Sequence, residues 1–235
     1  MCRRGAGRCW WIWAKGMAFC ATQRPWGVDI SQAEAAILTH GHYDHGGGLG
    51  AFYGANQRAK VYIRREAFAP HYRADGGYIG LDPAYIWPSR ICWTEDVTNL
   101  WPGAYLCTCN GRPMAYGGAT EGMYTQMGRE RQPDDFSHEQ YLVLEEGGRR
   151  VVFSGCSHKG ICNIAAWLRP DVLIGGFHLR EDADPALVEQ VGRRLLALGG
   201  IYYTCHCTSQ GAYARLKDIM GEKLRRLRAG DVAEI

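Results

Sequence analysis

The order of apolar and polar residues from Val28 onward predicts short strands that alternate with helices. Three apolar runs have the length and residue types of strands: residues 35–39, 61–63 and 104–108. A helix is predicted from about Gly48 through Tyr53, and a further helical turn is predicted up to about Tyr72. Strands that alternate with helices indicate an α/β protein built in layers.

The second half of the chain has the clearer periodicity. Two apolar runs flank Gly147 and Gly148 and predict a β-hairpin of residues 140–145 and 150–154. The next predicted elements are a helix over 161–168, a strand over 171–175, a helix begun by Asp184 and Pro185, a strand over 201–204 and a last helix capped by Ser209. Residues 231–235 are expected to close the sheet. The apolar faces of the last two helices are expected to be Leu187, Val188, Val191, Leu195 and Leu198, and Ala212, Leu216, Ile219 and Met220.

Two stretches depart from this pattern. Residues 110–137 are polar and rich in Gly and Pro, which is typical either of a functional lid or binding loop or of a disordered segment. Residues 1–27 contain four of the eight Trp and no acidic residue, and the first acid is Asp29. Because a GC-rich gene read out of frame has this composition, we hypothesise that about the first 26 residues are frameshifted or mis-started. Residues 1–27 are thus set apart as an atypical segment, and the domain proper is predicted over 28–235. The alternative for the first segment is an unusual aromatic N-terminal strand.

Composition narrows the class of protein. A chain of 235 residues suits one sizeable domain or two small halves that share a core. The net charge of +3, without a basic block, disfavours nucleic acid as a partner. No apolar run approaches the roughly 20 residues of a membrane span, and none resembles a secretory leader. The ten Cys contain no Cys-x-x-Cys, so a reduced, cytoplasmic setting is expected.

The richest chemistry lies at residues 40–45, which read His-Gly-His-Tyr-Asp-His directly after an apolar run. Side chains two apart on an extended segment point the same way, so His40 and His42 can converge on one ion. The turn that follows can aim Asp44 and His45 at a neighbouring position. Imidazole and carboxylate are usual ligands of catalytic zinc and iron, so these four residues are predicted to bind metal.

Three later histidines each follow a predicted strand, at positions 158, 178 and 206. We predict that His158 and His206 complete the metal site, and that His178 is either a ligand or a hydrogen-bond partner of one. His138 is a weaker candidate, and His71, on a polar stretch, is expected at the surface.

Two pairs of cysteines are also spaced by two, Cys107 with Cys109 and Cys205 with Cys207. Such pairs could hold zinc, but buried small residues are the favoured interpretation.

A metal ion with an open position lowers the pKa of bound water to about 7 and so supplies hydroxide at neutral pH. Asp44 could bind a second ion or orient the nucleophile. Lys159, next to His158, could neutralise a phosphate or carboxylate of the substrate; the alternative is a solvated lysine. Asp44, His178 and Lys159 are therefore the predicted catalytic residues.

Residues 28–235 resemble the metallo-β-lactamase superfamily, whose hallmark is His-x-His-x-Asp-His after a strand. Four further stretches resemble one branch of it: Phe136–Gln140, Gly155–Ile164, Gly175–Leu179 and Tyr203–Thr208. That branch is named for a dihydropterin-aminobenzene-phosphate synthase and is also labelled metal-dependent hydrolases of the β-lactamase type.

The resemblance implies an αββα sandwich with metal at one edge, and zinc as the ion, with iron or manganese as alternatives. The superfamily usually has a bridging Asp where this chain has Cys156, so one or two ions are expected. The family also carries several strands before the histidine cluster, whereas 39 residues precede His40 here. An incomplete or aberrant N-terminal sheet is therefore expected.

These features favour a metal-dependent hydrolase, or hydrolase-like transferase, that uses a metal-activated water on a small, anionic molecule. One alternative is a transferase like the synthase that names the branch. Another is an inactive metal-binding relic, which the unusual N-terminal segment suggests. The sequence leaves open whether the chain forms a homo-oligomer.

Overall fold

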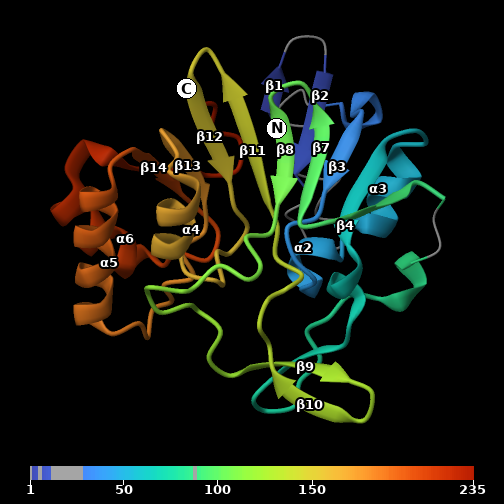
Figure 1. Cartoon of the computed structure of the whole chain (residues 1–235), viewed down its shortest axis with the longest axis horizontal. Coiled ribbons are helices and arrows are strands. Elements are labelled where there is room, and N and C mark those ends of the chain that lie inside the picture. The colour runs from blue at the N-terminus through green and yellow to red at the C-terminus, as the bar shows by residue number, and fades with distance from the viewer. Residues whose placement is uncertain (1, 5–6, 12–28, 87–88) are drawn as a thin grey trace. The chain divides into compact units, whose positions relative to one another are not determined.

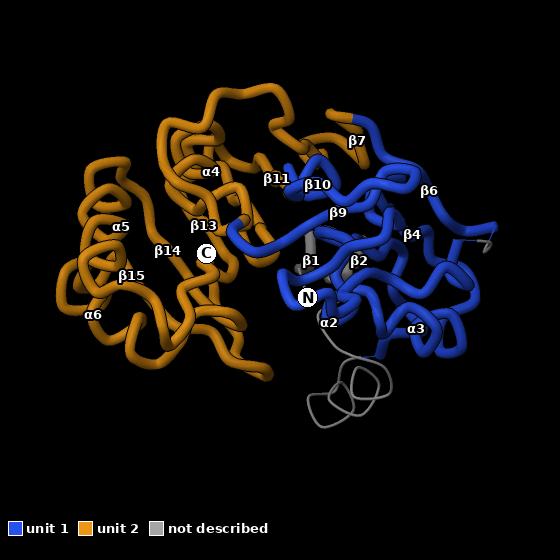
Figure 2. Tube along the Cα trace, turned by 90° about the horizontal axis from the view of Figure 1, so that it is seen from below, with its two compact units in different colours: residues 1–95, 121–139 blue, residues 96–120, 140–235 orange. Residues whose placement is uncertain are grey.

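The structure is a computed structural model that describes residues 2–4, 7–11, 29–86 and 89–235. The chain divides into two compact units, drawn in blue and orange in Figure 2. Unit 1 consists of residues 1–95 and 121–139, and unit 2 of residues 96–120 and 140–235. Each unit has a sheet and a buried apolar cluster of its own.

Unit 1 contains a five-stranded sheet in the order β1-β2-β3-β4-β6. Its strands are β1 (Cys2–Arg4), β2 (Gly7–Trp11), β3 (Ala35–Ile37), β4 (Lys60–Arg64) and β6 (Ile91–Thr94). β2, β3, β4 and β6 are parallel, and β1 is antiparallel to β2. Helices α2 (Tyr43–Gly46) and α3 (Leu49–Ala55) follow β3, and buried Leu49 and Phe52 of α3 join the apolar cluster.

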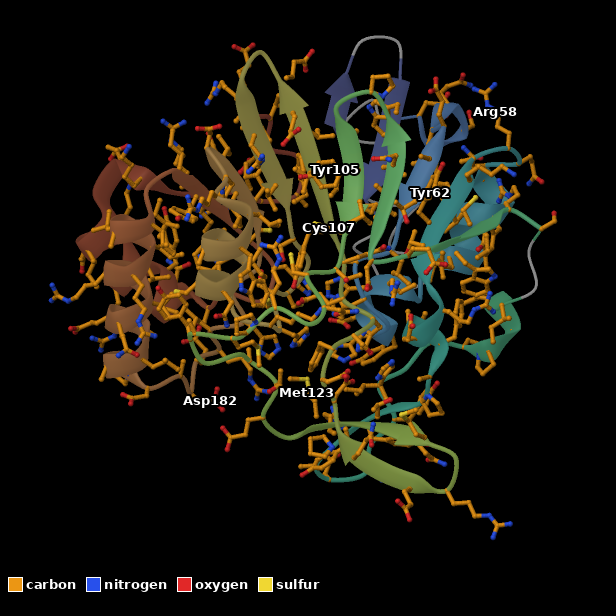
Figure 3. All side chains as sticks on the ribbon, viewed as in Figure 1. Arg58, Tyr62, Tyr105, Cys107, Met123 and Asp182 are labelled. Atoms are coloured by element: carbon orange, nitrogen blue, oxygen red, sulfur yellow. The ribbon has the colours of Figure 1, made fainter. Side chains whose placement is uncertain are left out.

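A small sheet in the order β10-β9-β5 completes unit 1 (Figure 1). Its strands are β5 (His71–Arg73), β9 (Met123–Met127) and β10 (Glu130–Pro133); Met123 is labelled in Figure 3. The helical turn predicted up to Tyr72 is wrong, because a 3-10 turn over residues 65–68 ends before Pro70 and a strand begins at His71. Proline disfavours the helical conformation of the residue before it, and Ala69 is extended. The predicted loop 110–137 therefore contains a hairpin.

Unit 2 contains a seven-stranded sheet in the order β15-β14-β13-β12-β11-β8-β7. The strands are β7 (Val97–Trp101), β8 (Ala104–Cys107), β11 (Tyr141–Glu146), β12 (Arg149–Phe153), β13 (Val172–Gly175), β14 (Ile201–Thr204) and β15 (Leu224–Arg226). β12 to β15 run parallel, so their carboxyl ends lie at one edge of the sheet. The predicted β11–β12 hairpin is confirmed, and Gly147 and Gly148 at its turn both have positive φ.

The helices of unit 2 are α4 (Ile161–Leu168), α5 (Pro185–Leu198) and α6 (Gln210–Met220), and α5 and α6 lie side by side (Figure 1). The predicted caps are confirmed, because Asp184 accepts from Ala186 N and Ser209 accepts from Ala212 N. The buried apolar face of α5 is narrower than predicted. Leu187 and Leu198 are 45% and 37% exposed, while Val188, Val191 and Leu195 are buried.

The predictions for the two ends of the chain have different outcomes. The prediction that residues 231–235 close the sheet is wrong, because β15 occupies that edge. Residues 12–28 lie outside the described residues, so the proposed frameshift stays a hypothesis. Before them, β2 pairs in parallel with β3. None of the described helices is both long and apolar enough to cross a membrane.

Candidate metal centre

The segment that follows β3 brings three imidazole rings together inside unit 1. The ring centroid of His40 lies 4.7 Å from that of His42 and 4.1 Å from that of His45. His40 and His45 are completely buried, and His42 is 6% exposed. The rings of His40 and His42, separated by one residue, thus lie edge to face, at an interplanar angle of 76°.

Asp44 lies on α2, one residue before His45. Its side chain is 40% exposed, and its Oδ2 lies 3.7 Å from His45 Nε2. A carboxylate with this exposure remains accessible to an ion or a water molecule. The short helix α2 therefore supplies a buried nitrogen donor and a half-exposed oxygen donor within one turn.

Gly41, between His40 and His42, is fixed on two sides. Its N–H donates to His138 Nδ1 over 2.9 Å. A Cβ atom at this position would collide with the backbone carbonyl oxygen of Ala67. Only glycine fits here without a backbone shift, so the histidine cluster rests on a closely packed turn.

A buried His-Asp-His group lies behind this turn. Asp134 Oδ2 is 2.8 Å from His71 Nδ1 and 3.3 Å from His138 Nε2. Burial alone would raise the pKa of Asp134, but hydrogen bonds from His138 and His71 outweigh it and hold that pKa well below its usual range. Burial lowers the pKa of His138, against the opposing bond to Asp134, so its ring is neutral at pH 7.

The expectation that His71 lies at the surface is wrong, because its side chain is 1% exposed. Its partner Asp134 was not among the predicted site residues. The pairing of His71 with Asp134 joins positions 63 apart in the chain. No local sequence pattern predicts it. The one local feature that could have pointed to Asp134 is its spacing of four from His138. This pair lies far along the chain from residues 40–45.

Unit 2 presents its candidate residues at the carboxyl ends of β12, β13 and β14. Ser157, His178 and His206 each have a φ between 49° and 60°, a left-handed conformation that costs a side chain about 1–3 kcal/mol. Backbone strain of this kind is common at functional sites. The structure therefore places the three predicted strand-end histidines at the common edge of the parallel strands.

His158 is the best-held histidine of unit 2. It is buried, its Nδ1 lies 3.0 Å from the carbonyl oxygen of Ala119, and its ring centroid is 4.4 Å from that of His178. Since a carbonyl only accepts, Nδ1 carries a proton, and in the neutral ring Nε2 then carries the lone pair. His178 is half-buried and His206 is exposed. Ligand roles for His158 and His206, and the role of His178, stay predictions.

Lys159 is buried, at 5% exposure. Its ammonium donates to the carbonyl oxygen of Thr108 over 2.9 Å and to Asn110 Oδ1 over 2.5 Å. These bonds tie the loop after β8 to the loop after β12. For the predicted contact with a substrate anion, the Lys159 ammonium would have to bind the anion as well as Thr108 and Asn110. This contact stays a prediction.

Of the four paired cysteines Cys107 is buried, as the interpretation of small buried residues requires, whereas Cys109, Cys205 and Cys207 are partly exposed. Cys107 is buried, and its hydrogen bond with Cys109, followed by burial, raises the pKa of its thiol. Burial raises the pKa of Cys205 to about 12. Cys207 differs: burial would raise its pKa, but hydrogen bonding with Cys156 and the charge of His206 lower it. Without a metal ion, the thiols of Cys107 and Cys205 are therefore protonated at neutral pH.

Known proteins share this architecture. Residues 13–104 match the family model described as the metallo-beta-lactamase superfamily. The whole chain is similar to the crystal structure of Tm1679, described as a metal-dependent hydrolase of the β-lactamase superfamily, with 26% identity, a TM-score of 0.84 and coverage of 99% of this chain and 93% of that one. The chain has the metallo-β-lactamase fold. The resemblance and the α/β fold class predicted from the sequence are confirmed.

Two further similarities concern more distant proteins. A curated relative from Methanocaldococcus jannaschii is 23% identical over 87% of this chain and 76% of its own length, and is named 7,8-dihydropterin-6-methyl-4-(beta-D-ribofuranosyl)-aminobenzene-5'-phosphate synthase. An isothiocyanate hydrolase from Delia radicum gut bacteria is 14% identical, with a TM-score of 0.54 over 87% of this chain and 77% of that one. The latter similarity concerns the fold alone.

The metallo-β-lactamase superfamily is metal-dependent, and the residues of unit 1 suit a divalent ion. Thr39 Oγ1 lies 2.9 Å from His40 Nδ1, which directs Nε2 of that ring to any ion, as in most histidine ligands. His71 Nε2 is buried and has no hydrogen-bond partner among the described residues. Neutral imidazoles beside one carboxylate form a donor set that zinc, iron and manganese all accept.

Proposed function

We propose that the protein is a metal-dependent hydrolase that acts on a small, anionic molecule with a metal-activated water. The observation that carries the proposal is the contact of the buried His40, His42 and His45 rings directly after β3 in a metallo-β-lactamase fold. When bound, a divalent ion supplies a hydroxide nucleophile at neutral pH and polarises the bond under attack.

Each residue of unit 1 has a distinct task in this proposal. His40, His42 and His45 are the nitrogen ligands, and their burial holds the three rings in place. The half-exposed Asp44 either binds a second ion or accepts a proton from the nucleophile and so orients it. From unit 2, His158 and His206 as ligands and His178 as their partner remain predictions from the sequence.

A hollow beside α2 supports a small-molecule substrate. It has a volume of about 510 Å³, within the range of ligand pockets. Its lining includes Tyr43, Tyr78 and Tyr85, and Tyr43 directly precedes Asp44. These aromatic walls would contact a planar or apolar part of a small molecule.

Two alternatives are kept because specific observations favour them. The name of the M. jannaschii relative suggests a synthase-like transferase. The composition of residues 1–27 suggests a metal-binding relic without activity. A homo-oligomer and a cytoplasmic location are also proposals.

Elemental analysis of the purified protein, combined with a generic phosphodiesterase and lactonase screen, tests the proposal. We expect one or two equivalents of zinc, iron or manganese, and an activity that a chelator removes and the metal restores. Bound metal without any activity would favour the relic. Protein that binds none of these metals would overturn the proposal.

A further inference from the structure

A chain of hydrogen bonds connects Asp134 to the backbone between two predicted ligands. Asp134 Oδ2 lies 3.3 Å from His138 Nε2, and His138 Nδ1 accepts from Gly41 N–H over 2.9 Å. Because an amide N–H only donates, His138 Nδ1 must carry the lone pair. The proton of the neutral ring is then on Nε2 and points to the carboxylate, so these partners select one tautomer.

The same carboxylate reaches the ligand segment by a second route. Asp134 Oδ2 is 2.8 Å from His71 Nδ1, and the ring of His71 packs at 75° against that of His42, with centroids 5.9 Å apart. Asp134 Oδ1 accepts from Phe136 N–H over 2.8 Å, and the Phe136 ring lies 5.7 Å from the His42 ring. Asp134 therefore organises three groups that contact the turn of His40, Gly41 and His42.

This group is unsuited to hold an ion of its own, although its residue types would allow one. Both ring nitrogens of His138 and both oxygens of Asp134 already have hydrogen-bond partners. An ion in the middle would have to displace the bonds that satisfy a carboxylate only 4% exposed, and an unpaired buried charge is costly. Of the side-chain nitrogen and oxygen atoms in this group, only His71 Nε2 has no hydrogen-bond partner among the described residues, so the other five are already engaged in supporting the turn.

We propose that Asp134 and His138 are positioning residues of the metal centre: Asp134 orients His138, and His138 fixes the backbone between His40 and His42. The proposal rests on the proposed function, because it assumes that these two histidines bind metal. Ligands held in place before the ion arrives lose less conformational freedom on binding. Removing such a supporting partner typically lowers metal affinity by about 10- to 100-fold.

A matched pair of substitutions isolates the bond to Gly41. In His138→Asn the side-chain oxygen can replace Nδ1 as the acceptor for Gly41 N–H. In His138→Gln the amide can replace Nε2 toward Asp134, but no acceptor remains near Gly41. Metal-free protein is titrated with Co²⁺ in competition with a chelator of known affinity, and the visible absorption of the bound ion reports ligand geometry.

We expect His138→Gln to weaken Co²⁺ binding by about 10-fold or more and to change the absorption spectrum, while His138→Asn stays within about 3-fold of the unaltered protein. Equal affinity in all three proteins would overturn the proposal. Equal weakening in both variants would also overturn it, because the size of the ring and not its acceptor would then matter.

Asp134→Asn is the second variant, for the case in which His138→Gln does not fold. It keeps the shape of the side chain but loses the charge that holds both histidines, and the same weakening of about 10-fold is expected. An Asp134→Asn protein that folds and binds Co²⁺ with unaltered affinity would overturn the proposal. If unaltered protein binds no metal, the proposed function itself fails; if it binds metal tightly and these variants do too, only the positioning role fails.

Discussion

In unit 1 the candidate ligands His40, His42 and His45 lie on a short buried turn that hydrogen bonds from Asp134, His138 and Thr39 support. In unit 2 the candidate histidines follow three parallel strands, and the backbone itself is forced into the left-handed region at Ser157, His178 and His206. Unit 1 orders its histidines with buried polar partners, whereas unit 2 places His178 and His206 on strained backbone after parallel strands and holds His158 through the carbonyl oxygen of Ala119. Substitutions should therefore disturb the histidines of the two units in different ways: through lost hydrogen bonds in unit 1 and through lost packing of the sheet and helices in unit 2.

The largest expected effect concerns the ligands of unit 1. We expect His40→Ala and His42→Ala each to abolish tight metal binding, a larger loss than the about 10- to 100-fold typical of supporting partners. Cys107→Ala, in unit 2, should keep its metal because that thiol is buried and protonated. Metal content after dialysis measures the difference. Equal content in the three variants would refute the ligand assignment.

The second prediction concerns the apolar packing of helix α5 in unit 2. Leu195 of α5 is completely buried in the apolar cluster of unit 2. Leu195→Ala should therefore lower the free energy of unfolding by about 2–5 kcal/mol. The control is Leu187→Ala on the same helix, at a side chain 45% exposed, with an expected change within about 0.5 kcal/mol. Urea denaturation of both variants measures these changes. Similar losses for the two would contradict the described face of α5.

Acid should weaken unit 1 through Asp134. The pKa of this carboxylate is lowered in the folded protein, so its contribution to stability is present above its unfolded pKa of about 3.9 and is lost as the pH falls below that value. In metal-free protein, Asp134→Asn should cost about 2 kcal/mol at pH 7, and less at pH 3. Unfolding free energies at several pH values test this. A difference that stays constant down to pH 3 would argue against a buried, ionised Asp134.

The smallest effect is a gain in unit 2. Arg169 ends α4 with a φ of 44° and is exposed, a conformation that glycine adopts without strain. Arg169→Gly should stabilise the protein by about 0.5–1 kcal/mol. Thermal unfolding at neutral pH can detect this gain, and a loss of stability would show that the arginine side chain outweighs its backbone cost.

Local patterns in the sequence predicted much of unit 2. The helices α4, α5 and α6 and the β11–β12 hairpin depend on periodicity, caps and glycines that lie within each element. The same reasoning predicted that His40 and His42 converge, because a spacing of two is a local property. The fold class followed from these elements together with the resemblance to a family.

Long-range partners were beyond local reasoning. His71 was expected at the surface, whereas its side chain is buried and bonded to Asp134, 63 positions away. The β9–β10 hairpin was missed because its residues do not alternate clearly between apolar and polar. Lys159 was predicted to meet a substrate, but its partners Thr108 and Asn110 come from a loop about 50 residues earlier, at separations of 51 and 49.

The Gly41 amide offers a way to observe the site without a ligand. Its proton is buried and bonded to an imidazole nitrogen, so it should exchange slowly with deuterated solvent. Glycine amides usually have low nitrogen frequencies in NMR spectra, which makes such a signal easy to find. Its exchange rate would give the free energy of local opening between His40 and His42. This one amide would therefore report how often the turn that carries the two histidines opens.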